Sequence, residues 1–141
     1  MDDEITIFER FFRAELLTVS ELSTCISGRL SNTVGTSKAV FPRAIFNVVP
    51  LDDKTGQART HIQTRLLVDF KIFATLPLPA TIGPAVMAVK EHFRESRTFD
   101  FEGHRISVRH ERPIAFVEKG ATADEKIITR GGTYRAWVSR A

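Results

Sequence analysis

Residues 66–74, with the sequence LLVDFKIFA, decide the fold class of this chain. A period of two in apolar residues is typical of a β-strand, and we expect this strand to run from Ile62 to Leu76. Because Leu67 and Phe73 are apolar at the intervening positions, the second face of the strand is expected to be partly buried as well. The residues that set the period are Leu66, Val68, Phe70 and Ile72.

The stretch before this strand predicts its partner. Ala44 to Val49 is a short apolar run of β-branched and aromatic residues that ends at Pro50. The next ten residues, 51–60, are polar and rich in turn formers, so the two strands are expected to form an antiparallel hairpin. In the first strand, Ile45 and Val49 face away from the side that its other apolar residues occupy.

The C-terminal part predicts further strands. Residues 104–111 alternate apolar and charged side chains, Pro113 is expected to break the strand, and residues 114–118 resume it. The last strand is expected over residues 127–138, with a β-bulge at Gly131 and Gly132.

Two segments have helical periodicity. The N-terminal segment places apolar side chains at steps of three and four residues, with Asp2 or Asp3 as the cap. A second helix is expected over about residues 83–95, with Pro84 in its first turn. Residues 18–27 fit either a second short helix or a continuation of the first. The N-terminal stripe consists of Ile5, Phe8, Phe12 and Leu16.

These elements predict an α+β fold for a single domain over residues 1–141. The expected architecture is a four-stranded, mainly antiparallel sheet with two principal helices, in the order α-β-β-α-β-β. Two long polar loops, near residues 28–39 and 51–60, lack any apolar period, so we expect them to be mobile in the free protein.

Composition narrows the class of protein. The chain has 141 residues, of which 43% are hydrophobic and 26% charged, with a net charge of +3. These values are those of an ordinary globular domain and exclude a disordered, collagenous or coiled-coil chain. No apolar run reaches the roughly 20 residues of a membrane helix, and the acidic start lacks the basic region of a secretory signal. The single Cys25 fits a reducing compartment, so we expect a soluble intracellular protein.

No residue set predicts catalysis, a cofactor or a metal. A zinc site needs three or four ligands at close spacing, and none of the four histidines, His61, His92, His104 and His110, lies in such a pattern. Asp52 and Asp53 are adjacent and are typical of a turn. We therefore predict a protein that is not an enzyme, with no cofactor and no metal site.

The strands carry apolar residues on both faces, which bears on assembly. Tyr134 and Trp137 are separated by an odd number of residues, so they are expected on opposite faces of the last strand. Two short helices cover one face well, so the second face needs either a helix of its own or a neighbouring subunit. The candidate contacts between subunits or rings are Ile45, Val49, Phe73, Trp137, Arg29, Lys54 and Arg59.

The element order and several short patterns resemble the small tail-terminator and tail-completion proteins of tailed bacteriophages and phage-derived particles. The resemblance covers roughly residues 5–139. The patterns that carry it are ISGRL (26–30), FPRAIFNVVP (41–50), LLVDFKIFA (66–74) and TRGGTYRAWV (129–138).

The resemblance implies a virion structural protein that forms a closed ring, most commonly of six copies. Such a ring caps the tail tube, stops its polymerisation and joins it to the head–neck connector. It implies as partners further copies of the chain, the tail tube protein and the connector, with genome DNA only passing through the bore and no membrane. The protein would be assembled in the host cytoplasm and reside in the tail and neck of the virion.

Two alternatives stay open at the level of sequence. The first is a head-completion or neck adaptor ring of the same particles, which differs in its contact faces. The second is a small α+β module that binds a ligand or nucleic acid, which needs a pocket or exposed aromatic residues on the sheet. One tryptophan and one tyrosine make a poor stacking platform.

Overall fold

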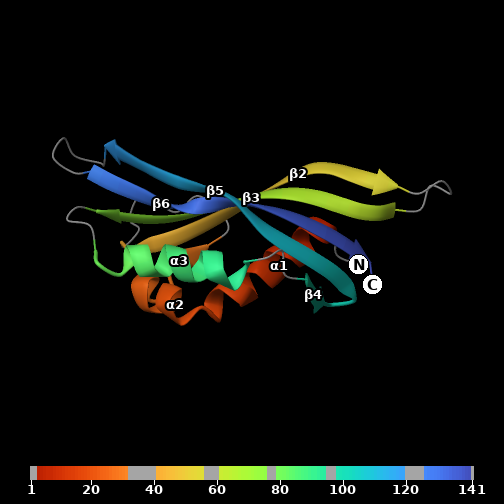
Figure 1. The fold of residues 1–141 in the computed structure, drawn as a ribbon, viewed down its shortest axis with the longest axis horizontal. Coiled ribbons are helices and arrows are strands. Elements are labelled where there is room, and N and C mark those ends of the chain that lie inside the picture. The colour runs from red at the N-terminus through yellow and green to blue at the C-terminus, as the bar shows by residue number, and fades with distance from the viewer. Residues whose placement is uncertain are drawn as a thin grey trace.

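The fold is a single sheet with one layer of helices (Figure 1). The computed structural model describes residues 3–31, 41–55, 61–75, 79–94, 98–119 and 126–140, and for residues 52–55, 61–62 and 119 the backbone alone. In chain order the elements are α1 (Glu4–Leu17), α2 (Ser20–Ile26), β1 (Leu30–Ser31), β2 (Arg43–Thr55), β3 (His61–Thr75), α3 (Ile82–His92), β4 (Thr98–Phe101), β5 (His104–Lys119) and β6 (Lys126–Arg140).

The sheet has six strands in the order β1-β2-β3-β6-β5-β4. The pair β1–β2 is parallel and the other pairs are antiparallel. The predicted four-stranded antiparallel sheet with two principal helices is therefore wrong, because the described residues form a mixed six-stranded sheet with three helices. Strands β2 and β3 form one long hairpin, β5 and β6 form another, and β3 pairs with β6 at the centre of the sheet.

Several expected boundaries differ from those observed. The first of the two predicted loops contains β1, and residues 51–55 of the second continue β2. Residues 32–40 and 56–60 lie outside the described residues, so the expected mobility of these loops stays a prediction. The ambiguous segment 18–27 forms a separate helix, α2, which ends where Ser27 adopts a left-handed conformation (φ 51°) before Gly28.

The irregularity near Gly131 lies in the neighbouring strand. Strand β5 runs without a break through Pro113, and its register against β6 shifts between His110 and Arg112, so the bulge is in β5. Proline is tolerated there because β4 pairs only with residues 104–107 and leaves the outer edge of β5 at Pro113 without a partner among the described strands. The predicted bulge at Gly131 and Gly132 is thus wrong.

Gly131 allows β6 to lie unusually close to β3. An added Cβ there would lie 1.9 Å from the carbonyl oxygen of Phe70 on β3, which no side chain can occupy. At Gly132, an added Cβ would lie 3.0 Å from the His110 ring. The two glycines therefore let β6 pass close to its neighbours at the centre of the sheet.

Helix α1 forms where the sequence predicts it. The Asp3 side chain caps the helix by accepting a hydrogen bond from the Thr6 backbone N–H at 2.7 Å. The buried face of α1 includes Phe8, Phe12 and Leu16, as predicted, together with Phe11.

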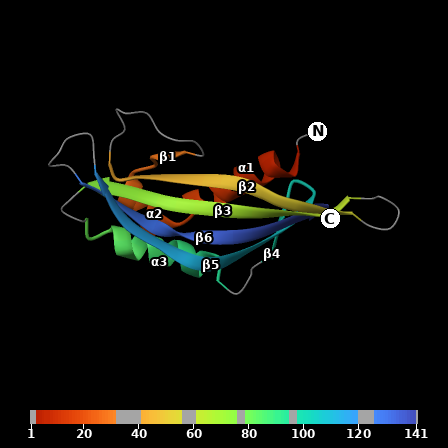
Figure 2. The same cartoon turned by 90° about the horizontal axis from the view of Figure 1, so that it is seen from above.

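All three helices lie on the same side of the sheet, which we call the covered face (Figure 1). Seen from above, the long strands β2, β3, β5 and β6 lie in front of the helices (Figure 2), while β4 curls down beside α1 (Figure 1). The apolar residues that set the period of β3 are buried on the covered face, as predicted, and so is Tyr134 on β6. Phe12 of α1 joins the two layers, because its ring centroid lies 5.2 Å from those of Phe46 on β2 and Phe93 after α3.

Candidate functional site

The opposite face of the sheet, which we call the uncovered face, has no helix on it among the described residues. Trp137 lies on this face and Tyr134 on the other, as predicted. The alternative in which each face has its own helix is excluded for the described helices, which share one side (Figure 1). The apolar side chains of the uncovered face are half-buried or exposed, with Val49 42% and Phe116 42% exposed. They are Ile45, Val49, Leu67, Phe73, Ile114, Phe116 and Trp137.

Each aromatic ring on the uncovered face has a cation above it. The Arg109 guanidinium carbon lies 5.4 Å from the centroid of the Trp137 ring. The Arg43 guanidinium carbon lies 5.5 Å from the Phe73 ring. Cations within about 6 Å of an aromatic centroid are attracted by the electron-rich ring face. These contacts shield the rings from water and leave the surface cationic.

Phe116, the third aromatic residue of the uncovered face, also has a cation near its ring. The Lys71 ammonium nitrogen lies 5.9 Å from the centroid of the Phe116 ring. Arg43 also lies 5.5 Å from the Phe41 ring, and its buried Nε has no hydrogen-bond partner. Arg43 is therefore held by aromatic contacts with part of its hydrogen-bonding capacity unused.

Four arginines lie near Trp137 and Glu111 on this face, and we call Arg65, Arg109, Arg112 and Arg135 the arginine cluster. The strand register places Arg65 opposite Trp137 and Arg109 opposite Arg135. Like charges directly opposite each other repel, so this arrangement costs stability unless a counter-ion is present.

Glu111 supplies the counter-charge within the chain. Glu111 occupies the bulge of β5, and its Oε2 accepts a hydrogen bond from Arg135 Nε at 2.7 Å. This bond, and then the nearby charges of Arg135, Arg112 and Arg109, lower the pKa of Glu111. The bond to Glu111 raises the pKa of Arg135, while the charge of Arg65 opposes that rise. The Glu111 carboxylate therefore interacts with three of the four arginines, Arg135, Arg112 and Arg109.

The rows from Arg43 to Trp137 are strongly cationic. By register the acidic residues of these rows are Glu111, Asp69 and Asp52, and Asp52, described by its backbone alone, lies opposite Arg65. Asp69 Oδ1 accepts a hydrogen bond from Thr133 Oγ1 at 3.2 Å. The cations of the same rows are Arg43, Arg65, Lys71, Arg109, Arg112 and Arg135. This face therefore suits a partner that brings carboxylates or phosphates.

The structure brings together four of the seven predicted contact residues. Ile45, Val49, Phe73 and Trp137 share the uncovered face. Arg29 is elsewhere, because its Nε donates a hydrogen bond to the Pro42 carbonyl oxygen at 2.9 Å and ties the start of β1 to that of β2.

The last two predicted contacts cannot be placed by their side chains. Lys54 is opposite Gln63 in the β2–β3 ladder, and only its backbone is described. Arg59 lies outside the described residues.

The arginine cluster is the feature that sequence reasoning missed. The alternation within β6 could have placed Arg135 on the same face as Trp137, because the two residues are two positions apart on one strand. The position of Arg65 opposite Trp137 depends on the β3–β6 register. Arg109 could not be placed, because the register of β5 depends on a bulge that the sequence does not mark.

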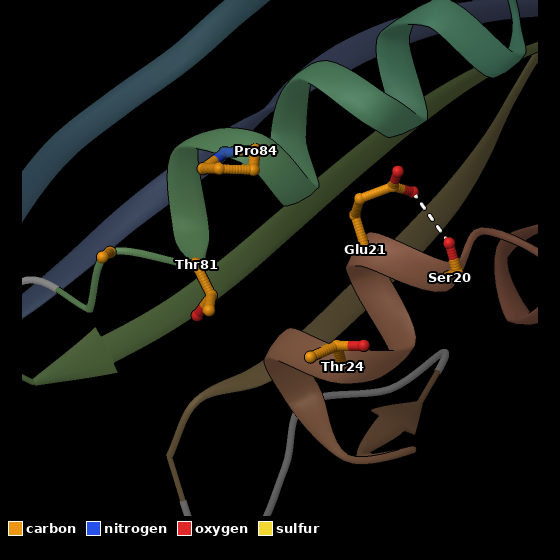
Figure 3. Close-up of a pocket in the computed structure, with 6 residues that line it drawn as sticks. Ser20, Glu21, Thr24, Thr81 and Pro84 are labelled. Carbon is orange, nitrogen blue, oxygen red and sulfur yellow. Dashed lines mark hydrogen bonds between the residues drawn. The ribbon is translucent and has the colours of Figure 1, made fainter.

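The helix layer carries a groove between α2 and α3, which we call the Glu21 groove (Figure 3). It has a volume of about 280 Å³ and a mainly apolar lining. Glu21 Oε2 lies 3.2 Å from the Ser20 hydroxyl oxygen, which donates to it. The lining residues are Ser20, Glu21, Thr24, Ala80, Thr81 and Pro84.

The groove does not hold a set of catalytic groups. Among the described residues that line the groove, no histidine, cysteine or lysine lies beside the hydroxyl groups to act as a base. Across the described part of the chain, no group of three His, Cys, Asp or Glu residues could hold a metal ion. No helix within the described ranges is long and apolar enough to span a membrane.

The described histidines have structural partners. His92 Nε2 lies 3.0 Å from Glu15 Oε2, and His104 Nδ1 lies 3.0 Å from the Glu102 carbonyl oxygen. The His110 ring packs edge-on against Tyr134. His92 and His110 therefore link separate segments of the fold, and His104 contacts the turn between β4 and β5.

Comparison with known proteins places the chain in no family: no protein-family model matches it, and no curated protein matches its sequence.

Proposed function

We propose that this chain is a virion structural protein, a tail terminator that forms a ring at the end of the tail tube. One observation carries the proposal: a sheet with a helix layer on one face presents apolar and arginine side chains on the other. Tryptophan and arginine are the residues most enriched where protein contacts contribute most to affinity. The resemblance of residues 5–139 to tail-terminator proteins supplies the particular assembly.

In this proposal, the function is binding without chemistry. Copies of the chain associate through the uncovered face, and the closed ring covers the growing end of the tube. The tube protein can then add no further ring, while the outer side of the terminator ring receives the head–neck connector.

The arginine cluster fits a ring only if it faces protein and not the bore. DNA that passes a ring must not be held by exposed cations, since each phosphate contact strengthens binding. Arginines that face a neighbouring protein are not available to the passing DNA. The proposal therefore places Trp137 and its surrounding arginines between subunits.

A tube-growth assay tests the proposed function. The tail tube protein of the same particle is allowed to polymerise with and without the purified chain, and the tubes are imaged by electron microscopy. We expect shorter tubes that carry a ring at one end. Tubes of unchanged length without a terminal ring would contradict a terminator role.

The same samples separate the terminator from the neck adaptor. A neck adaptor would bind the purified head–neck connector and leave tube growth unchanged. A chain that retards single-stranded or duplex DNA in a gel at physiological salt, and binds neither tube nor connector, would instead be a nucleic-acid-binding module.

A further inference from the structure

We propose that the uncovered face of one copy packs against the helix layer of the next copy, with the arginine cluster facing the Glu21 groove. The inference rests on the proposed ring-forming function and specifies the two surfaces that form the ring contact. It assigns Arg109 and Glu21 as partners across that contact.

The arginine cluster is prepared for carboxylates. The Arg109 guanidinium carbon lies 5.4 Å from the centroid of the Trp137 ring, a cation–π distance. A guanidinium carries five N–H donors in a planar fork that matches a carboxylate, so a contact with a ring leaves donors for a carboxylate. Among the side chains that the structure describes, the carboxylate nearest to Arg109 in the cluster is Glu111, which is bonded to Arg135. Arg109 therefore has the geometry to receive a carboxylate from another molecule.

The Glu21 groove has the complementary properties. Its apolar lining suits the methylene stem of an arginine, while the exposed Glu21 carboxylate suits the guanidinium. The helix layer as a whole carries more carboxylates than cations. From the α1 cap through α3, its carboxylates are Asp3, Glu4, Glu9, Glu15, Glu21 and Glu91, against Arg10, Arg13 and Lys90 as its lysines and arginines. Charge complementarity therefore favours sheet against helices.

Two other occupants fit less well. Face-to-face packing of two uncovered faces would set one arginine cluster against another, and such like-charge contact is unfavourable. A nucleic acid could contact the arginines, but the ring faces of Phe73, Phe116 and Trp137 already carry cations that a base would have to displace.

The geometry of the contact fits a ring. Because the two surfaces differ and lie on opposite layers of one molecule, each copy can bind one neighbour on each side. Such head-to-tail contacts generate closed rings when the rotation between copies closes, and open filaments when it does not. No partner beyond the chain itself is needed.

Site-directed cross-linking tests which surfaces meet. Thr24→Cys lies in the groove and Ser107→Cys lies opposite Trp137 on β5, so both variants leave Arg109 and Glu21 in place. Treated with a short bismaleimide, a mixture of the two variants should give dimers, and either variant alone should not. The double variant should give a ladder that ends at the ring size. The wild type is the blank, because Cys25 is buried.

Charge exchange tests the assigned pair. These changes are made in the double variant Thr24→Cys, Ser107→Cys. There, Arg109→Glu or Glu21→Arg alone should lower the yield of cross-linked product about tenfold, the loss expected for a close charge pair. Both changes in one chain should restore most of the yield. Arg94→Glu makes the same change in charge near the C-terminal end of α3, away from the groove, and should leave the yield unchanged.

Three results would overturn the inference. The first is the formation of dimers by Ser107→Cys alone, which would show face-to-face packing. The second is the absence of any cross-linked product. The third is a cross-linking yield of the charge-exchanged variant that stays as low as the yields of the single variants. The tube-growth assay separates this inference from the proposed function. Tubes capped by rings that do not cross-link would support the proposed function and contradict the proposed contact. Rings that cross-link but cap no tubes would support the contact and contradict the terminator function.

Discussion

Tyr134 and Trp137 are three residues apart on β6, yet they belong to two different surfaces. Tyr134 is 1% exposed and lies among aromatic rings, with centroid distances of 5.8 Å to Phe93 and 6.2 Å to Phe12. Trp137 is half-buried and carries an arginine on its ring. On the covered face aromatic rings pack on each other, while on the uncovered face each ring packs against a cation.

This difference separates the requirements of folding from those of association. Ring-on-ring packing removes apolar area from water and fixes the positions of the helices. Cation-on-ring packing keeps a monomer's surface charged, and it holds arginines in place for a partner. We therefore expect substitutions on the covered face to change stability and those on the uncovered face to change assembly.

The largest effect is expected at Gly131, on which both faces depend. The methyl group in Gly131→Ala would lie 1.9 Å from a backbone oxygen of β3, so β3 and β6 must separate. We expect a loss of more than about 4 kcal/mol in the free energy of unfolding, measured by urea denaturation. The matched control, Gly83→Ala in the first turn of α3, has open space around the new methyl group and should change the free energy of unfolding by less than about 1 kcal/mol. The gain usual for a helix interior is offset there, because a Cβ before Pro84 disfavours the helical backbone. A stable Gly131→Ala protein would show that this close approach is not essential.

The next effect distinguishes the two faces directly. Tyr134→Ala should lower the free energy of unfolding by roughly 2–4 kcal/mol, because it empties a packed aromatic site. Trp137→Ala should cost the monomer less than Tyr134→Ala and reduce assembly more. Thermal melts and tube-capping assays on both variants check this. Unfolding by Trp137→Ala with a stable Tyr134→Ala would mean that the roles of the faces are reversed.

A smaller effect is expected at Arg43. The buried Nε of Arg43 has no hydrogen-bond partner, and an unsatisfied buried donor costs about 1–3 kcal/mol. Arg43→Met keeps the apolar stem between Phe41 and Phe73, so denaturation should show equal stability or a gain of about 1 kcal/mol. Lys71→Met is the control without such a buried donor and should change little. A clear loss in Arg43→Met would mean that the aromatic contacts of its guanidinium stabilise the fold.

The smallest effect is a dependence of stability on pH at the covered face. Burial, and then the charge of Lys90, lower the pKa of His110 in the folded protein. The unfolded chain therefore binds a proton first as the pH falls. The stability that neutral His110 contributes is present above its unfolded pKa, about 6.5, and is lost as the pH falls through the lower folded pKa.

His110→Gln tests this dependence. Relative to wild type, the variant should lose less stability between about pH 7 and pH 5, because glutamine does not titrate. Melting temperatures measured across this range give the comparison. Parallel curves for the two proteins would show that His110 does not contribute to the pH dependence.

The sequence predicted the long strands because their period of two is unambiguous. The alternation over residues 66–73 correctly separates the covered from the uncovered face, and the odd spacing of Tyr134 and Trp137 correctly places them apart. The short strands β1 and β4 were missed because two and four residues give no period to detect. The fold class was wrong for that reason and because α2 has only seven residues.

The candidate site was only partly predictable, since it depends on register. Local sequence does not say that Arg109 lies opposite Arg135, because the β5 bulge at Glu111 shifts the pairing. Pro113 suggested a break, although an edge strand can contain a proline. The Gly131–Gly132 pair suggested a bulge, whereas the lack of a Cβ at Gly131 serves close approach to β3. Each of these outcomes depends on residues far away in sequence.

The emission of Trp137 tests the central claim most directly, because the chain has a single tryptophan. Fluorescence and mass are measured on the same samples as the protein is diluted from tens of micromolar to tens of nanomolar. If the uncovered face is the contact between copies, the emission shifts to shorter wavelength as oligomers form, and Arg109→Glu moves both transitions to higher concentration. Oligomers whose tryptophan emission stays that of the diluted monomer would contradict the account.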